Sequence, residues 1–112
     1  MSEFLFLFRG SQRLARSPEE MQVSMQKWVA WFKGLHEMGV VKDPGNPLDA
    51  SGKVVRGRSK DIYDGPYAEA KDLVNGYVVI ETPTMDEAVQ LSQGCPILDD
   101  GGSVEVRPIR KF

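Results

Sequence analysis

The alternation of apolar and polar stretches divides the chain into strands, helices and turns. The run from Phe4 to Phe8 has no polar interruption, a pattern typical of a strand buried on both faces. A second such run, Tyr77 to Ile80, lies inside a strand predicted over 76–82. Apolar and charged residues alternate between 103 and 109, which predicts a strand with one buried face.

Two amphipathic segments predict helices. Ser17 and Glu20 have the spacing of a capping box and begin the longer helix, which ends at Gly39. Thr84 and Glu87 repeat that spacing and begin a short helix. The apolar residues of the longer helix should pack on a sheet: Met21, Met25, Trp28, Val29, Phe32 and Leu35.

The segment 43–64 is rich in Pro, Gly, Asp and Ser and should therefore turn repeatedly. Residues 43–47 form one turn, and residues 50–53 are expected at the tip of a hairpin between short strands. Arg56, Arg58 and Lys60 alternate in strand register, which favours three cations on one solvated strand face. The other reading is that these cations bind a carboxylate or phosphate.

This order of elements predicts an α+β, ferredoxin-like domain spanning residues 1–112. Its four-stranded antiparallel sheet carries two helices on one face. Because the central strands are apolar on both sides, the other face needs a cover. We expect a homodimer in which two sheets pack face to face as a dimeric α/β barrel. The alternative is that the segment 43–64 folds over the open face.

Composition narrows the classes of function. With 14 basic and 16 acidic residues the net charge is −2, which argues against a nucleic-acid-binding protein. Cys95 is the single cysteine, so no intramolecular disulfide can form. The apolar run at Phe4–Phe8 is too short for a signal peptide or a membrane span, so we expect a cytoplasmic protein without a membrane partner.

His36 is the only histidine, which excludes a serine or cysteine triad and a multi-histidine metal site within one chain. There is also no glycine-rich phosphate-binding motif, so we expect neither a metal nor a cofactor. His36 falls at the edge of the apolar stripe of the longer helix. There it is either a packed, hydrogen-bonded residue or a proton-transfer group.

Asp64, Glu69 and Lys71 are the main candidates for chemistry. Two acids and an ammonium within eight residues can hold a polar ligand and move a proton. The alternative is structural. Asp64 would then order the turn before Gly65 and Pro66, while Glu69 and Lys71 would pair on the surface or across a dimer.

The block Asp64–Asp72, which reads DGPYAEAKD, resembles the signature of the DGPF branch of the YCII-related family. That branch usually reads Asp-Gly-Pro-Phe-Ala-Glu-x-Lys-Glu, followed by Gly-Phe or Gly-Tyr at a strand start, as at Gly76-Tyr77 here. The departures are Tyr67 for Phe and Asp72 for Glu. Similarity extends over essentially the whole chain and includes residues 86–88 and 106–108.

The resemblance implies the dimeric ferredoxin-like fold, but most members of the family have no assigned reaction. The wider superfamily includes small dehydrochlorinase-like and muconolactone-isomerase-like enzymes. Some DGPF proteins are encoded beside sigma factors of the extracytoplasmic-function type.

Two hypotheses of function follow. In the first, a small organic acid is bound or processed by metal-free acid–base chemistry, in a cleft between the sheet and the 43–72 loops. Asp64 or His36 would act as base, and the ligand would contact Glu69, Lys71, Arg107 and Tyr67. In the second, the protein is a non-catalytic regulatory partner linked to sigma-factor-dependent transcription.

Overall fold

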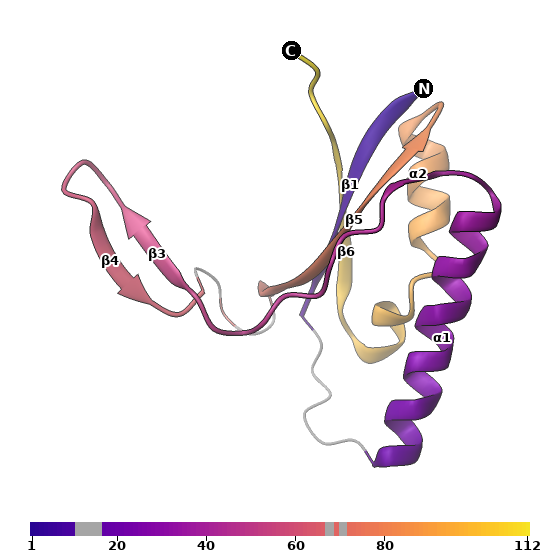
Figure 1. Cartoon of the computed structure of the whole chain (residues 1–112), viewed down its shortest axis with the longest axis horizontal. Coiled ribbons are helices and arrows are strands. Elements are labelled where there is room, and N and C mark those ends of the chain that lie inside the picture. The colour runs from indigo at the N-terminus through magenta and orange to yellow at the C-terminus, as the bar shows by residue number, and fades with distance from the viewer. Residues whose placement is uncertain (11–16, 67–68, 70–71) are drawn as a thin grey trace.

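A computed structural model describes residues 1–10, 17–66, 69 and 72–112. The main sheet and two helices form the body of the protein, and a separate hairpin projects from it (Figure 1). The elements in chain order are β1 (Ser2–Arg9), α1 (Pro18–Glu37), β2 (Val41–Asp43), β3 (Lys53–Arg56), β4 (Asp61–Asp64), β5 (Val74–Thr82), α2 (Met85–Ser92), the 3₁₀-helix η2 (Pro96–Asp100) and β6 (Ser103–Pro108).

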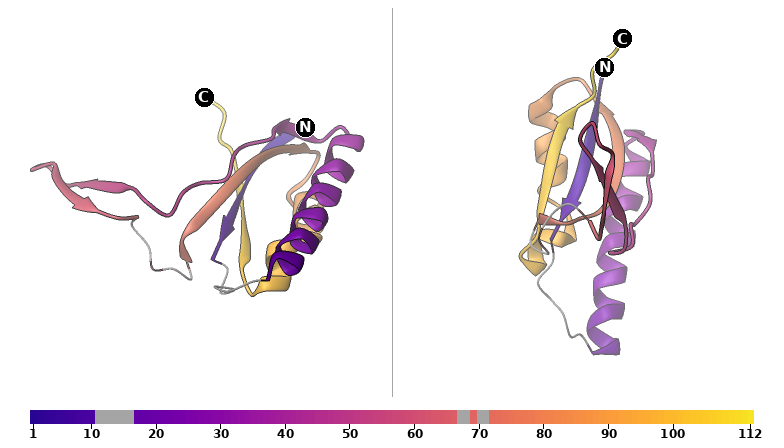
Figure 2. Two further views of the ribbon diagram at one scale, coloured as in Figure 1. Left: turned by 60° about the horizontal axis from the view of Figure 1, so that its bottom comes forward. Right: turned by 90° about the vertical axis from the view of Figure 1, so that its left-hand side faces the viewer.

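The main sheet has the strand order β2-β5-β1-β6, and all its neighbours are antiparallel. This is the ferredoxin-like order, and α1 and α2 lie together on one face, so the predicted fold class is confirmed (Figure 2). The N-terminal strand β1 occupies the centre. There Phe6 pairs with Val78 of β5 on one side and with Val106 of β6 on the other.

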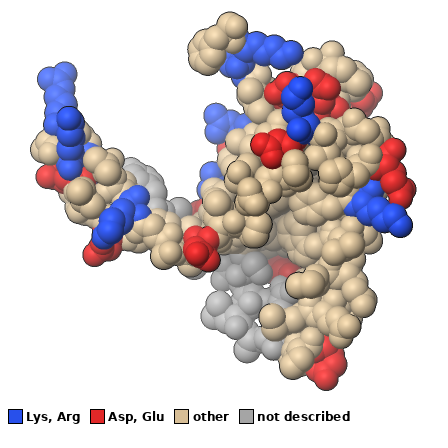
Figure 3. Space-filling model, viewed as in Figure 1, with Lys and Arg blue, Asp and Glu red and all other residues tan. Residues whose placement is uncertain are grey.

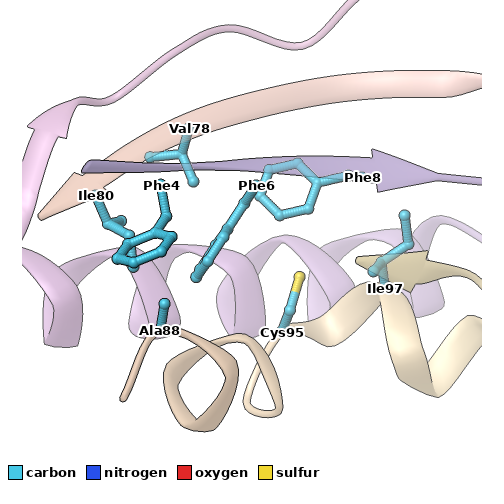
Figure 4. Packing of buried hydrophobic residues seen from close by; sticks show 8 residues of the cluster. All are labelled: Phe4, Phe6, Phe8, Val78, Ile80, Ala88, Cys95 and Ile97. Carbon is cyan, nitrogen blue, oxygen red and sulfur yellow. The ribbon is translucent and has the colours of Figure 1, made fainter. Parts of the chain in front are cut away.

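The core lies between the sheet and the helices. Phe4, Phe6 and Phe8 project from β1 toward the helix layer (Figure 4), and Phe6 is fully buried. Trp28 and Trp31 of α1 pack edge-on against Phe8, with ring centroids 5.2 and 5.8 Å away. Complete burial of one such side chain contributes on the order of 2–3 kcal/mol. The aromatic cluster therefore fixes α1 on the sheet.

The predicted helix starts are confirmed. Ser17 accepts a hydrogen bond from the backbone N–H of Glu20, whose carboxylate accepts one from the N–H of Ser17, which completes the capping box. Thr84 caps α2 by accepting from the N–H of Glu87. Two short elements, β2 and η2, were not expected.

The predicted apolar stripe of α1 is only half correct. Trp28, Phe32 and Leu35 face the core, whereas the side chains with 58, 68 and 62% exposure are Met21, Met25 and Val29. The helix is rotated toward α2, where the indole N–H of Trp31 donates to the carbonyl of Leu91 at 3.1 Å. Two adjacent helices share the sheet, so the far flank of α1 stays in solvent.

The hairpin differs from the one predicted. Its strands are β3 and β4, so its tip lies at residues 57–60 instead of 50–53. Gly57 and Lys60 adopt positive φ angles of 73° and 60°, and the N–H of Lys60 donates to the carbonyl of Gly57. Because Arg58 and Lys60 sit in this turn, they do not form the predicted strand face with Arg56.

The hairpin also leaves the second face of the sheet uncovered. We call this the open face; Leu5 and Leu7 of β1 lie on it, opposite Val79 and Tyr77 of β5. The hairpin projects from the side of the sheet opposite the helices instead of folding over that face (Figure 1). None of the described helices is long and apolar enough to cross a membrane.

Candidate functional site

A cleft of about 500 Å³ lies at the end of β1, where the chain enters β5. Arg9 stands at the last position of β1, and the segment before β3 forms the opposite wall. The volume falls within the range of small-molecule sites, about 300–1,000 Å³. Its polar lining consists of Arg9, Asp49, Ser51 and Asp72, and Leu48 and Pro66 contribute apolar walls.

Backbone hydrogen bonds hold this wall on the sheet. Gly45 turns the chain with a φ of 67°, and its N–H donates to the carboxylate of Asp43 at 2.9 Å. Leu48 donates its N–H to the carbonyl of Asn75 at 2.7 Å. Gly45 must be glycine, because an added Cβ would lie 1.7 Å from the carbonyl oxygen of Tyr77. The connector therefore runs tightly along the start of β5.

Arg9 joins the cleft to the charged end of the open face. Its Nη1 donates to the backbone carbonyl of Asp72 at 2.6 Å, and its Nε donates to Oε1 of Glu105 at 2.8 Å. Arg107 donates to the other oxygen of Glu105 at 3.3 Å. The hydrogen bond from Arg9, aided by both positive charges, lowers the pKa of the Glu105 carboxyl.

The YCII-related domain family matches residues 4–112 of this sequence. The chain belongs to this family. None of the curated proteins matches it.

A solved structure resembles this YCII-related domain over almost its full length. It is the 5-chloro-2-hydroxyhydroquinone dehydrochlorinase (TftG) from Burkholderia phenoliruptrix AC1100, in complex with 2,5-dihydroxybenzoquinone. The TM-score is 0.53, and the match covers 98% of this chain and 95% of that one. The sequence identity is 16%, so this likeness shows the fold alone.

Asp64 lies at the base of the hairpin of the YCII-related domain, beyond the cleft lining. Its carboxylate pairs with the ammonium of Lys53 across the β3–β4 ladder, and its side chain is 88% exposed. Pro66, two residues later, lines the cleft. Glu69 is exposed, and Tyr67 and Lys71 lie outside the described residues.

Arg107 lies beside Glu105 on β6, at the open face, where its side chain is 64% exposed. His36 lies in the last turn of α1, on the helix side of the sheet. His36 is exposed, because the rotation of α1 toward α2 leaves the far flank of this helix in solvent. Of the two interpretations of His36, the packed residue is therefore wrong. The structure does not bring His36 and Asp64 together.

Cys95 lies in the core, and burial raises the pKa of its thiol to about 12. Such a thiol is a poor nucleophile. Among the described residues, no group of three or more His, Cys, Asp or Glu side chains is arranged to hold a metal ion.

Sequence reasoning missed the three polar residues that the fold brings to this end of the sheet: Arg9, Asp49 and Glu105. The only local signal is that Arg9 is the first charge after an apolar strand. Its pairing with Glu105 depends on the β1–β6 register, which joins residues 96 positions apart.

Proposed function

We propose that this YCII-related domain binds and processes a small organic acid in the cleft at the end of β1. The observation that carries the proposal is the position of Arg9, a guanidinium in the lining of a cleft of about 500 Å³. Its two described contacts use two of the five N–H donors of a guanidinium, whose planar fork suits a carboxylate. Arg9 would therefore hold the anionic group of the ligand.

Proton transfer would fall to carboxylates near that anion. Asp49 and Asp72 line the cleft, and Asp64 stands at the foot of the hairpin. A carboxylate can remove a proton from a carbon next to the ligand's acid or carbonyl group. The reaction class would be isomerisation or elimination by acid–base chemistry. Glu69, Tyr67, Lys71 and Arg107 would complete ligand binding around the cleft.

The test is a thermal-shift screen with small cyclic and unsaturated acids, for example benzoate, hydroxybenzoates and fumarate. A ligand that binds the folded chain stabilises it by RT ln(1 + L/Kd), where L is the free ligand concentration, so Tm rises with the logarithm of that concentration once it exceeds Kd. We expect at least one acid to stabilise the wild type and Arg110→Gln, a matched exposed arginine. The same acid should not stabilise Arg9→Gln.

Because Arg9→Gln also removes a bond to Glu105, each variant is compared with itself in the presence and absence of ligand. Failure of every acid to stabilise the wild type would refute the proposal, and so would an unchanged response in Arg9→Gln. Asp49→Asn, Asp72→Asn and Asp64→Asn, made one at a time, then separate binding from chemistry. At least one of the three variants should keep the thermal shift and lose turnover of the acid that binds.

A second function is supported by the positions of the two residues that were predicted as alternative bases. His36 lies on the helix side of the sheet and Asp64 lies beyond the cleft lining, so neither of them stands in the proposed site. The chain would then be a non-catalytic regulatory protein linked to sigma-factor-dependent transcription. It would recover a specific protein partner in a pull-down and would turn over none of the acids.

We also propose that the chain is a homodimer. The central residues of the open face are apolar, namely Leu5, Leu7, Tyr77 and Val79. A second copy, related by a two-fold axis and packed face to face, would bury these four residues in both copies.

A further inference from the structure

The β3–β4 hairpin is the part of the described structure that is least able to be stable by itself. It has two strands of four residues each, and such an isolated hairpin is marginally stable in water. Val55 and Ile62 pair across the strands with 65 and 66% of their surface exposed. On the other face, Tyr63 is 47% exposed beneath the guanidinium of Arg56. Both faces of the hairpin therefore present apolar surface to solvent.

The hairpin also makes the single chain unusually extended. The radius of gyration is 15.6 Å, whereas a compact domain of this length has about 13 Å. A hollow separates the hairpin from the open face of the sheet (Figure 3). The hollow lies on the side where a second copy would pack, so the hairpin flanks the space that the partner would occupy.

A second copy would meet the hairpin at a defined place. Facing sheets lie about 10 Å apart and a four-residue strand spans about 13 Å, so the hairpin strands by themselves would reach the level of the partner's sheet. The connector before β3, at about 3.3 Å per residue, adds the length that would carry the tip to the helix side (Figure 1). A two-fold axis along the strands places the β2 edge of one copy over the β6 edge of the other. The hairpin leaves the sheet between β2 and β5, so it would descend beside the partner's β6 and η2.

A groove of about 270 Å³ lies between α1 and η2, at this position. It opens at the same end of the sheet as the hairpin, because Val74 and Ser103, which follow the hairpin and η2, both pair with Arg9. Its described lining is acidic overall, with Glu19 and Glu20 from α1 and Asp99 and Asp100 from η2. Lys27 is the one cation among these described lining residues, and it pairs with Asp99 at 3.6 Å.

The hairpin tip has the opposite charge. It carries Arg58 and Lys60, with Arg56 at the end of β3 beside it, and Asp61 is the nearest acid along the chain. Figure 3 shows both basic and acidic side chains on the hairpin, and acidic side chains at the end of α1. Complementary charge and matching position therefore select a second copy of this chain as the occupant of the groove.

We propose that the β3–β4 hairpin is an arm that packs on a second copy of the chain, with its cationic tip in the acidic α1–η2 groove of that copy. This inference rests on the proposed homodimer and adds to it a specific contact. The arm would lose the solvent exposure of its apolar side chains Val55, Ile62 and Tyr63. Each arm would also hold the segment before β3, which forms a wall of the cleft in the same chain.

The test is disulfide cross-linking between the tip and the groove. Ser59→Cys places a thiol at the tip, and Ser24→Cys places one in the groove lining, while the native Cys95 is buried. The full chain carrying both substitutions should form a covalent dimer under mild oxidation. The control pairs Ser59→Cys with Ser2→Cys, which lies at the opposite end of β1 and should not cross-link.

Sedimentation velocity measures the oligomeric state and so separates the arm contact from the homodimer on which it rests. A dimer in which Ser59 and Ser24 fail to cross-link would overturn the arm and leave the homodimer standing. Cross-linking to Ser2 instead would also overturn it, because the two-fold axis would then run across the strands. A monomer at micromolar concentration would overturn both.

Charge reversal gives an independent check. Arg58→Glu with Lys60→Glu should raise the dimer dissociation constant by roughly tenfold, and adding Glu19→Lys with Asp99→Lys should restore it. Arg110→Glu with Lys111→Glu is the matched control and should leave the constant unchanged. Weakening by the control pair, or no effect of the tip pair, would contradict the proposed contact.

Discussion

Replacing Gly45 by alanine should destabilise the protein more than the same change at two other connector glycines, Gly52 and Gly65. The three positions differ in one factor at a time. Gly52 has no positive φ, and a Cβ there meets nothing within 4 Å. Gly65 has a φ of 84° but open space around it. Gly45 combines a φ of 67° with a Cβ position 1.7 Å from the carbonyl oxygen of Tyr77.

The magnitudes follow from these differences. An alanine that is compatible with the native backbone stabilises by up to about 1 kcal/mol through the unfolded state, so Gly52→Ala should be neutral or mildly stabilising. Left-handed strain costs about 1–2 kcal/mol, which leaves Gly65→Ala destabilised by about 1 kcal/mol.

At Gly45 the connector must also lift off β5. That movement breaks the hydrogen bonds from Tyr77 to Asn46 and from Leu48 to Asn75. Each bond contributes about 1 kcal/mol, which brings the expected loss for Gly45→Ala to about 3 kcal/mol.

Urea denaturation followed by the fluorescence of Trp28 and Trp31 measures these values, at one fixed protein concentration for all variants. Gly52→Ala should unfold at the highest urea concentration, Gly65→Ala at a lower one, and Gly45→Ala at the lowest. The reasoning fails if Gly45→Ala and Gly65→Ala unfold at the same urea concentration, because the contact with Tyr77 would then carry no cost.

Two further predictions concern titratable groups. The native thiol of Cys95, with a pKa of about 12, should not react with a disulfide reagent at pH 8 and should react fully in urea; rapid labelling of the folded protein would contradict its burial. Because its folded pKa is lowered, Glu105 stabilises the fold above its unfolded pKa, and this contribution is lost as the pH falls through the folded pKa. Glu105→Gln should therefore be less stable than the wild type at pH 7, by under about 1 kcal/mol given the partial exposure of the pair, and this difference should shrink as the pH falls through the folded pKa. A difference that does not change with falling pH would have another origin.

Local sequence rules predicted the parts of the fold that depend on near neighbours. The caps at Ser17 and Thr84 require only residues three positions apart, and both are present. The two-sided apolar character of Phe4–Phe8 correctly placed β1 at the centre of the sheet and indicated an open face. The position of the hairpin tip was missed because residues 50–53 and 57–60 carry similar turn chemistry.

The candidate site was less predictable, since its parts meet only through long-range register. The sequence pointed to the 64–72 block, and Pro66 and Asp72 do line the cleft. Arg9 joins them from the other end of the chain, through a bond to Asp72 that spans 63 positions. The flank of α1 that stays exposed could not be predicted either, because the rotation of a helix depends on its neighbour α2.

The central position of β1 has a consequence for how the chain reaches its native state. Both neighbours of β1 in the sheet, β5 and β6, come from the last 39 residues. During synthesis the first strand therefore emerges long before either strand that pairs with it. Such non-local pairing slows folding and leaves an apolar strand unpaired in the nascent chain. Release of a chain truncated before Ser103 would leave one edge of β1 open, and we expect that product to aggregate or be degraded.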